Sequence, residues 1–189
     1  MTKEEALDLL DDKKLDIKIV NSIYNEFLDD DEIVALVAMN ISRKTDVDNP
    51  QKTASDTMVD LLTKLSSHSD MGVRWAVAKS PHTKAEVLQI LSDDEVNLVR
   101  ALVATNINTP LSCLKKLYND EKIVKDGLTG NPNTPQEYLI EMAQDSDKMI
   151  RMRVASNPST PKQTLQHLCD DSNEDVAIVA KKALEGTLE

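Results

Sequence analysis

The sequence is poor in the residues on which several classes of functional site depend. Its 189 residues include only four Gly, two Cys, one Trp, three Tyr and one Phe. Four scattered glycines exclude a Gly-rich loop that cradles a nucleotide phosphate. The two cysteines, Cys113 and Cys169, are too few and too far apart for a zinc cluster or a disulfide framework. We expect both to be small apolar core residues.

Positive charge and long hydrophobic runs are also scarce. The chain has 22 Lys and Arg against 33 Asp and Glu, a net charge of −11, which argues against a nucleic-acid binder and favours a basic partner. No apolar run approaches the roughly 18 residues of a membrane helix. Because residues 1–14 are too charged for a signal peptide, we expect a cytoplasmic protein with no membrane partner.

The chain does contain an internal repeat of about 26 residues. One eight-residue segment, Val-Arg-Ala-Leu-Val-Ala-Thr-Asn at 99–106, recurs closely or loosely at 33–40, 73–80, 124–131 and 150–157. The lead residues, which open the copies from 73 onward, are Val73, Val99, Val124, Ile150 and, in a degenerate last copy, Val176. Two further apolar columns keep the same spacing: Leu62, Leu88, Leu114, Leu139 and Leu165, and Leu65, Leu91, Leu117, Met142 and Leu168.

Each repeat carries the signals of two short helices. In the copy at 99–106, Val99 and Val103 form one face of the first helix, and Asp94 is expected to cap its start. Asn106 is expected to end that helix in a left-handed conformation. Thr109 and Pro110 then read as the N-cap and first residue of the second helix. In two other copies the Thr has a capping-box partner three residues later: Thr134 with Glu137, and Thr160 with Gln163.

Helices this short are unstable alone, so the repeats must stack and bury their apolar faces against one another. The sequence therefore predicts an all-α fold, a right-handed α-solenoid of short helix pairs in one continuous domain. We expect an N-terminal helical cap at 1–29 and a divergent first repeat at 30–65, with an inserted loop at 41–54. Four regular repeats at 66–169 and a C-terminal capping helix at 170–189 complete the prediction. The insertion is either a tolerated surface loop or a binding loop.

The repeat consensus, Asp-x-x-x-x-Val-Arg-x-x-Val-Ala-x-Asn-x-x-Thr-Pro-x-x-x-Leu-x-x-Leu, resembles that of the leucine-rich repeat variant family. The resemblance covers about residues 65–180. It implies a short-unit solenoid, similar in style to HEAT and armadillo repeats, in which the second helix is often 3₁₀. Some members carry a Cys-rich iron–sulfur segment before the repeats, and this chain has no cysteine before Cys113. The resemblance implies a fold and no particular activity.

No catalytic, cofactor-binding or metal-binding constellation stands out. His68, His82 and His167 occupy different positions of the repeat and therefore form no column. One histidine with a nearby carboxylate is too small a set for a metal site. We therefore expect no enzyme activity, no cofactor and no metal.

Two columns are candidate partner contacts. The first is basic and follows the lead residue: Arg74, Arg100, Lys125 and Arg151. These side chains either bind an acidic partner or a phosphate backbone, or pair with the acids of the neighbouring repeat. The second column varies from repeat to repeat and contains Trp75 and Met152, which are either exposed contacts or, for Trp75, folded back on neighbouring helices.

These observations predict a non-enzymatic scaffold for protein–protein interaction, which binds a protein or peptide partner on the solenoid surface. One alternative is an acidic inhibitor or immunity-type protein that blocks a basic nucleic-acid-binding enzyme. A third, a nucleic-acid enzyme like the HEAT-like DNA glycosylases, is disfavoured by the net charge. The oligomeric state is open.

Overall fold

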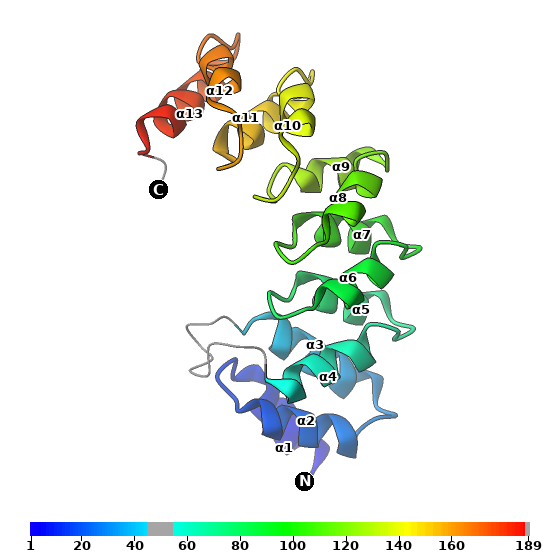
Figure 1. Ribbon diagram of the computed structural model, residues 1–189. Helices are drawn as coiled ribbons and strands as arrows, with labels where there is room; N and C mark the ends of the chain where they lie inside the picture. Colours follow the sequence, from blue (N-terminus) through cyan, green and yellow to red (C-terminus); the bar gives the residue numbers. More distant parts are fainter. Residues whose placement is uncertain (45–54, 188–189) are drawn as a thin grey trace.

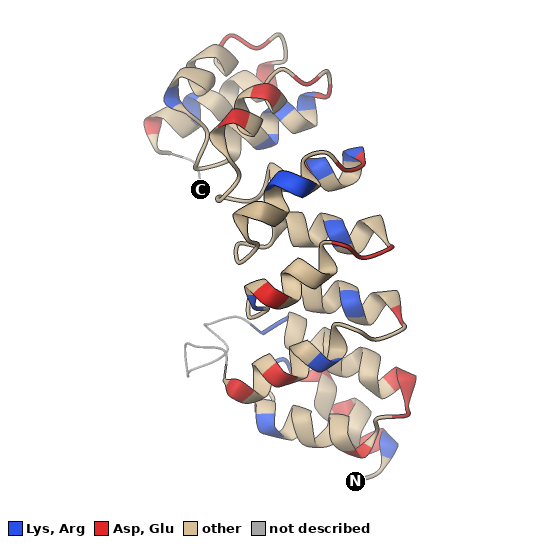
Figure 2. Cartoon of the chain, turned by 45° about the vertical axis from the view of Figure 1, so that its right-hand side comes forward, with Lys and Arg blue, Asp and Glu red and all other residues tan. Residues whose placement is uncertain are grey.

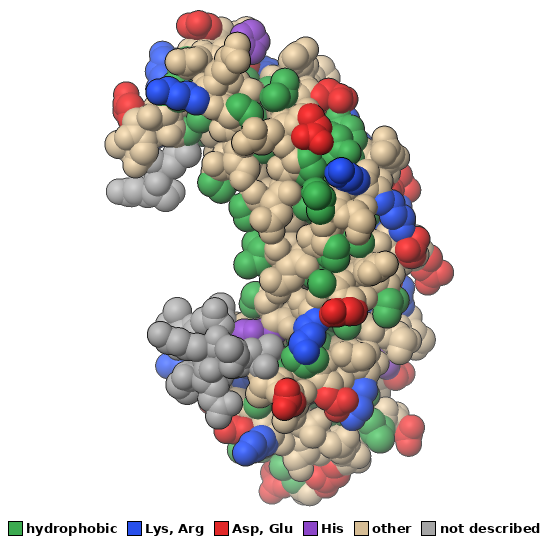
Figure 3. All heavy atoms as spheres, viewed as in Figure 1, with side chains coloured by type: hydrophobic (Ala, Val, Ile, Leu, Met, Phe, Trp, Pro, Cys, Tyr) green, Lys and Arg blue, Asp and Glu red, His purple; other side chains and the backbone are tan. Residues whose placement is uncertain are grey.

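A computed structural model describes residues 1–44 and 55–187, and in these residues the chain is all-helical, with thirteen helices and no strand. The helices form a curved stack that is hollowed on one side (Figures 1 and 3). The fold class predicted from the repeat, an all-α solenoid, is confirmed. Residues 45–54, most of the predicted insertion, lie outside the described residues, and Ile41 and Ser42 belong to a helix rather than to a loop.

Each repeat contributes an odd-numbered and an even-numbered helix. The odd-numbered helices are α3 (Asp31–Ser42), α5 (Met71–Lys79), α7 (Asn97–Thr105), α9 (Lys122–Leu128), α11 (Lys148–Ser156) and α13 (Glu174–Glu185). The even-numbered helices are α4 (Asp56–Leu65), α6 (Ala85–Leu91), α8 (Leu111–Leu117), α10 (Gln136–Met142) and α12 (Lys162–Leu168), and they are α-helical rather than 3₁₀. Two further helices, α1 (Lys3–Asp11) and α2 (Ile17–Glu26), precede the first repeat.

The repeated apolar columns form one continuous core. The lead residues are at most 1% exposed: Val73, Val99, Val124, Ile150 and Val176. The first Leu column of the even helices is buried with them, from Leu62 to Leu165. Most successive odd helices pack side by side, as do α5 with α7 and α7 with α9. Since each unit buries its apolar face on its neighbours, the short helices are stable only within the array.

The Thr-Pro signals act differently from the prediction. The even helices α8, α10 and α12 begin after the proline, and no side chain caps them. The Thr109 hydroxyl instead donates to the carbonyl of Val103, 2.5 Å away in the preceding helix. Thr83, Thr134 and Thr160 repeat this bond on Val77, Leu128 and Val154. Thr109 is 4% exposed, and the nearest free acceptors in its buried turn are the carbonyls that end the odd helix.

The asparagines that recur in the turns of the repeat also differ from the prediction. Asn106 and Asn157 end their helices, but their backbone is extended rather than left-handed. The Asn131 side-chain nitrogen donates to two carbonyls of the preceding repeat, Ala104 at 2.9 Å and Asn106 at 2.7 Å. Its side-chain oxygen accepts the backbone N–H of Asn133. Asn40, Asn106 and Asn157 make the same pair of carbonyl bonds to the turn before them. We call these four residues the asparagine ladder.

Side chains cap several helix N-termini. Thr2 and Glu5 form a capping box at α1. Asp70 caps α5 by accepting the N–H of Val73, and Asp147 caps α11. The turns from odd to even helices, which hold the asparagine ladder, lie on the hollowed side of the stack (Figure 1). The turns from even to odd helices lie on the opposite side.

Replacing Asn131 by Ala should lower the free energy of unfolding by about 2–4 kcal/mol, since each unsatisfied buried polar group costs about 1–3 kcal/mol. The substitution leaves the carbonyls of Ala104 and Asn106 without a donor. Urea unfolding followed by circular dichroism measures the change. Asn133→Ala is the matched control, because this exposed side chain makes a single bond, to the Ile107 carbonyl. An Asn131→Ala loss no larger than that of the control would contradict the ladder's role.

Candidate functional site

The basic column forms ion pairs between repeats. Arg74 donates from Nε and Nη2 to the two carboxylate oxygens of Asp94, at 2.6 and 3.1 Å, and from Nη1 to the carbonyls of His68 and Ser69. Arg100 binds Asp120 and Arg151 binds Asp171 with the same geometry, at 2.7–2.9 Å. We call these three pairs the arginine rungs. Planar guanidinium groups suit such two-pronged binding of a carboxylate.

The rung acids differ from the predicted caps. Asp94 and Asp120 accept a backbone N–H in their own turn, but α7 and α9 have no side-chain cap bond. The carboxylates instead bind the arginine of the preceding repeat. Hydrogen bonds from Arg100 lower the pKa of Asp120 below its ordinary value, and Arg151 does the same for Asp171. The guanidinium groups of Arg74, Arg100 and Arg151 are thereby occupied, which favours the structural alternative for this column over partner contact.

Lys125, the fourth member of the basic column, makes no rung. Its amine lies over the Tyr118 ring, 4.2 Å from the centroid, and 3.6 Å from a carboxylate oxygen of Glu141. The acid at the rung position of the next repeat is Asp145, and Lys125 does not pair with it. The column is therefore interrupted between α9 and α11.

Trp75 and Met152 lie half-buried and pack against the core. The Lys79 amine is 4.9 Å from the centroid of the Trp75 ring, so this aromatic face is partly covered within the chain. The structure favours the alternative in which Trp75 folds back on neighbouring helices. Met152 on α11 is also partly buried and packs against the core.

A different apolar surface, absent from the sequence prediction, runs along the odd helices. One large apolar side chain on each odd helix is 39–45% exposed: Met39, Met71, Leu98, Ile123, Met149 and Ile178. We call this set the outer stripe. All six lie on one side of their helix, about 100–200° round from the buried lead residue when counted in one direction. In three consecutive repeats the exposed residue directly precedes the lead residue, as Leu98 precedes Val99. This partial column is the sequence signal from which the stripe could have been predicted.

Charged side chains border the outer stripe. Asn97 donates to Glu121, Lys122 pairs with Asp147, and Lys148 pairs with Asp175, each contact joining one odd helix to the next repeat. Acidic residues also gather in the turns that lead into the odd helices (Figure 2). Glu95 and Glu121 in these turns have side chains that are 85% and 63% exposed. The stripe is thus apolar along its centre and predominantly acidic along the edge formed by these turns.

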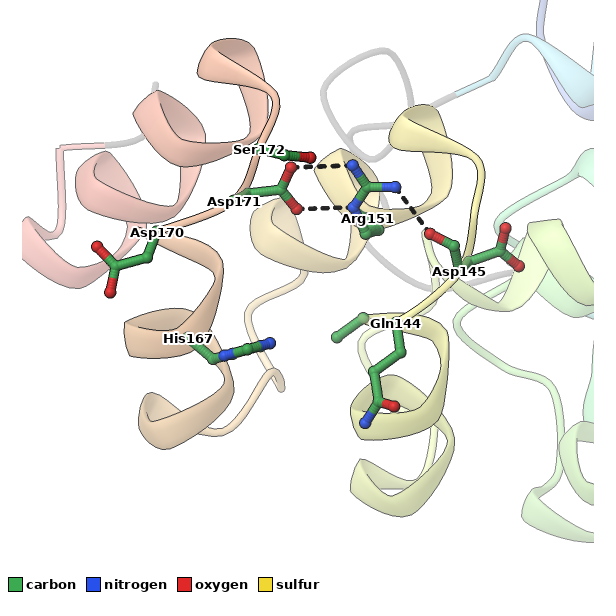
Figure 4. A pocket seen from close by; sticks show the side chains of 8 residues that line it. Gln144, Asp145, Arg151, His167, Asp170, Asp171 and Ser172 are labelled. Atoms are coloured by element: carbon green, nitrogen blue, oxygen red, sulfur yellow. Dashed lines mark hydrogen bonds and ion pairs between the residues drawn. The ribbon is translucent and has the colours of Figure 1, made fainter.

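Two cavities in the described residues are shallow and open to solvent. One of about 200 Å³ lies at the ends of α5 and α7, lined by Ala78, Pro81, Leu102 and Ile107 among others. Another, of about 320 Å³, lies between the ends of α10 and α12. In Figure 4 its Arg151 faces Asp171, and His167 and Gln144 stand on opposite sides. Ser172 beside it has no hydrogen bond to a base.

No group of three or more metal-ligating side chains gathers within residues 1–44 and 55–187. None of the helices in these residues has the length and hydrophobicity needed to cross a membrane.

The rungs predict a specific pH dependence. The pKa of Asp120 is lowered in the folded state, so its contribution to stability is present above its unfolded pKa of about 3.9 and is lost as the pH falls through the folded value. Arg100→Gln should lower the free energy of unfolding near pH 7 by about 2–4 kcal/mol, because it strands a largely buried carboxylate. The variant should then lose less than the wild type on acidification from about pH 5 to pH 3.

Urea midpoints measured across that range test both effects. Lys116→Gln is the matched control, since it removes an exposed ion pair with Asp93 and should cost at most about 1 kcal/mol. Equal acid sensitivity of Arg100→Gln and the wild type would show that the rung does not shift the titration of Asp120.

Comparison with known proteins identifies the architecture and no family. The sequence matches no protein-family model and no curated protein. Among solved structures it is similar to an engineered protein determined by the Northeast Structural Genomics Consortium, with 17% sequence identity and a TM-score of 0.54. The alignment covers 90% of this chain and 96% of the engineered protein. At this identity the similarity establishes the fold alone.

Proposed function

We propose that this protein is a non-catalytic scaffold that docks a protein or peptide partner on the outer stripe. The observation that carries the proposal is the exposure of one large apolar side chain on every odd helix, from Met39 on α3 to Ile178 on α13. Single exposed apolar residues are ordinary on protein surfaces. A row with one member per repeat is different, because a partner that follows the stack can contact all of its members together.

The even helices provide the comparison. Their most exposed apolar residues are Ile90 on α6, Leu111 on α8 and Ile140 on α10, at 64%, 53% and 45%. Measured from the member of the first Leu column on each helix, these three lie at about 200°, 60° and 100° round the helix, so they share no narrow arc and form no row. The apolar row is therefore a property of the odd-helix face rather than of the surface in general.

The cavity at the C-terminal ends of α5 and α7 is a separate place where a partner side chain could insert. Its volume of about 200 Å³ suits one apolar side chain, and its lining includes Ala78, Leu102 and Ile107. Met71 and Leu98 of the outer stripe lie at the N-terminal ends of the same helices, so the proposal rests on the stripe and not on this cavity.

Charge defines the partner further. The net charge of −11 and the exposed Glu95 and Glu121 favour a partner with basic residues at the rim of its apolar surface. The arginine rungs are unsuited to a row of phosphates because their guanidinium groups already bind carboxylates. We therefore rank nucleic-acid enzymes last among the alternatives. A cytoplasmic location and membership of the leucine-rich repeat variant family belong to this proposal as expectations.

An acidic inhibitor or immunity-type protein is the second candidate, and the exposed acids of the even-to-odd turns favour it (Figure 2). The two functions differ in the surface that carries the affinity. A stripe-docking scaffold depends on apolar contacts and is weakly sensitive to salt, whereas an acidic inhibitor depends on the turn carboxylates and weakens strongly as salt rises.

The double variant Leu98→Ser with Ile123→Ser should weaken partner binding by about 10–100-fold, since truncating hot-spot contacts costs about 1–2 kcal/mol each. The free energy of unfolding should change by no more than about 1 kcal/mol, because both side chains are exposed. Affinity capture from cell extract with the wild type and the variant identifies proteins whose recovery requires the stripe. Calorimetry with the purified partner then gives the Kd.

The matched control is Ile90→Ser with Leu111→Ser, which removes apolar side chains of similar exposure from the even helices. It should leave the Kd unchanged. Equal losses from both double variants would contradict docking on the stripe. Loss of binding in Glu95→Gln with Glu121→Gln, and not in the stripe variant, would establish the acidic-inhibitor alternative.

A further inference from the structure

The stack changes its packing at one junction. The odd helices pack side by side from α3 through α5 and α7 to α9, and again from α11 to α13. The pair α9 and α11 lacks this close packing. In two views of the molecule the course of the stack turns between α9 and α11 (Figures 1 and 2).

The missing arginine rung lies at the same junction. Arg100 on α7 joins its repeat to Asp120, ahead of α9, and Arg151 on α11 joins its repeat to Asp171, ahead of α13. Between α9 and α11 the equivalent pair would be Lys125 with Asp145. Asp145 already accepts a backbone N–H of its own turn, as Asp94 and Asp171 do, so the acceptor is in place. Lysine lacks the planar guanidinium group that binds both oxygens of a carboxylate, and the Lys125 amine contacts Tyr118 and Glu141 instead.

Gly127 allows α9 to pack closely on α7, its neighbour on the N-terminal side. A Cβ on Gly127 would lie 2.6 Å from the Ala101 carbonyl oxygen and 3.0 Å from the Ala104 Cβ, which are on α7. No side chain can occupy that space without moving backbone, so glycine permits the close approach of α9 to α7. Helix α9 therefore belongs to the N-terminal body of the stack rather than to the C-terminal one.

The hydrogen bonds and ion pairs that join the repeat of α9 to that of α11 are few, although α10 packs on α11 and its Tyr138 stacks on Tyr118. Asn157 bonds the carbonyls of Thr129 and Asn131 at 2.8 and 3.0 Å, at the turns on the hollowed side.

At the opposite end of the odd helices the α7–α9 and α11–α13 junctions each have an arginine rung. The α9–α11 junction has only the Lys122–Asp147 ion pair there, and its side chains are 65% and 37% exposed. Exposed pairs of this kind contribute about 0–1 kcal/mol.

We propose that the junction of α9 and α11 is a hinge, on which α11–α13 pivot as a body about the Asn157 bonds relative to α1–α9. The junctions of α5 with α7 and of α7 with α9 are held at both ends, by the asparagine ladder and by a rung, whereas this one is held at the ladder end. The hinge lies between Ile123 and Met149 of the outer stripe. Its angle therefore sets the distance between the part of the stripe that ends at Ile123 and the part that begins at Met149. That consequence rests on the proposed function, but the hinge itself does not.

Distances between pairs of spin labels test the hinge in the full chain without any partner. After replacement of Cys113 and Cys169 by Ala, one label pair at Gln89 and Gln166 spans the junction. A second pair, at Lys18 and Lys115, lies within the N-terminal body. We expect the spanning pair to show a broader distance distribution than the internal pair. Equal widths for the two pairs would overturn the proposal.

Lys125→Arg supplies the missing fork to Asp145 and should narrow the spanning distribution toward the width of the internal one. Lys125→Gln is the matched control, since it removes the amine without offering a fork, and should leave the distribution broad. Narrowing in both variants, or in neither, would contradict the role of the missing rung. Because no partner is present, a failed hinge and a failed docking surface give separate results.

Discussion

The fold depends on an amide group that reaches back one repeat. Every turn from an odd to an even helix leaves backbone carbonyls without a helical donor. The side-chain nitrogen of the next asparagine in the ladder has two hydrogens, and it gives one to each of two such carbonyls, as Asn131 does for Ala104 and Asn106. Where an asparagine is present, the bond pair fixes the distance and the register of consecutive repeats. Ser80 takes the place of the asparagine after α5, and there the packing of α3 on α5 holds the repeats together.

A second set of bonds works at the opposite end of the odd helices. The arginine rungs consume three guanidinium groups and three carboxylates in contacts within the chain. Most of the charge of the basic column is therefore neutralised within the chain. The surface that is left for a partner consists of the apolar outer stripe and of exposed acids such as Glu95, whose side chain stays 85% exposed beside Arg74.

The features that repeat with a fixed spacing were predicted correctly from the sequence. The lead valines and the Leu columns repeat in one register, so their burial and the helix pairs followed from spacing alone. Local capping rules placed the asparagines after α7 and α11 correctly at the ends of their helices, but they gave the wrong backbone conformation and missed the bonds between repeats, because the carbonyl that Asn131 binds lies 27 residues earlier. The same rules gave the turn threonines the wrong role, since their hydroxyls bind carbonyls of the preceding odd helix and do not cap the even helices. Pairing of Arg100 with Asp120 was among the alternatives since both columns share the period. The outer stripe was missed because its members shift between helix positions, from Met71 to Ile178, while keeping the same exposed arc.

Hydrogen exchange of the side-chain amide protons tests the ladder most directly. Nuclear magnetic resonance resolves these protons for Asn106, Asn131 and Asn157, and for Asn25 as an exposed reference. If the ladder holds the repeats in register, the protons of the three ladder residues exchange far more slowly than those of Asn25 and become unprotected together when the stack unfolds. Exchange of all four residues at the rate of Asn25 under native conditions would contradict the account.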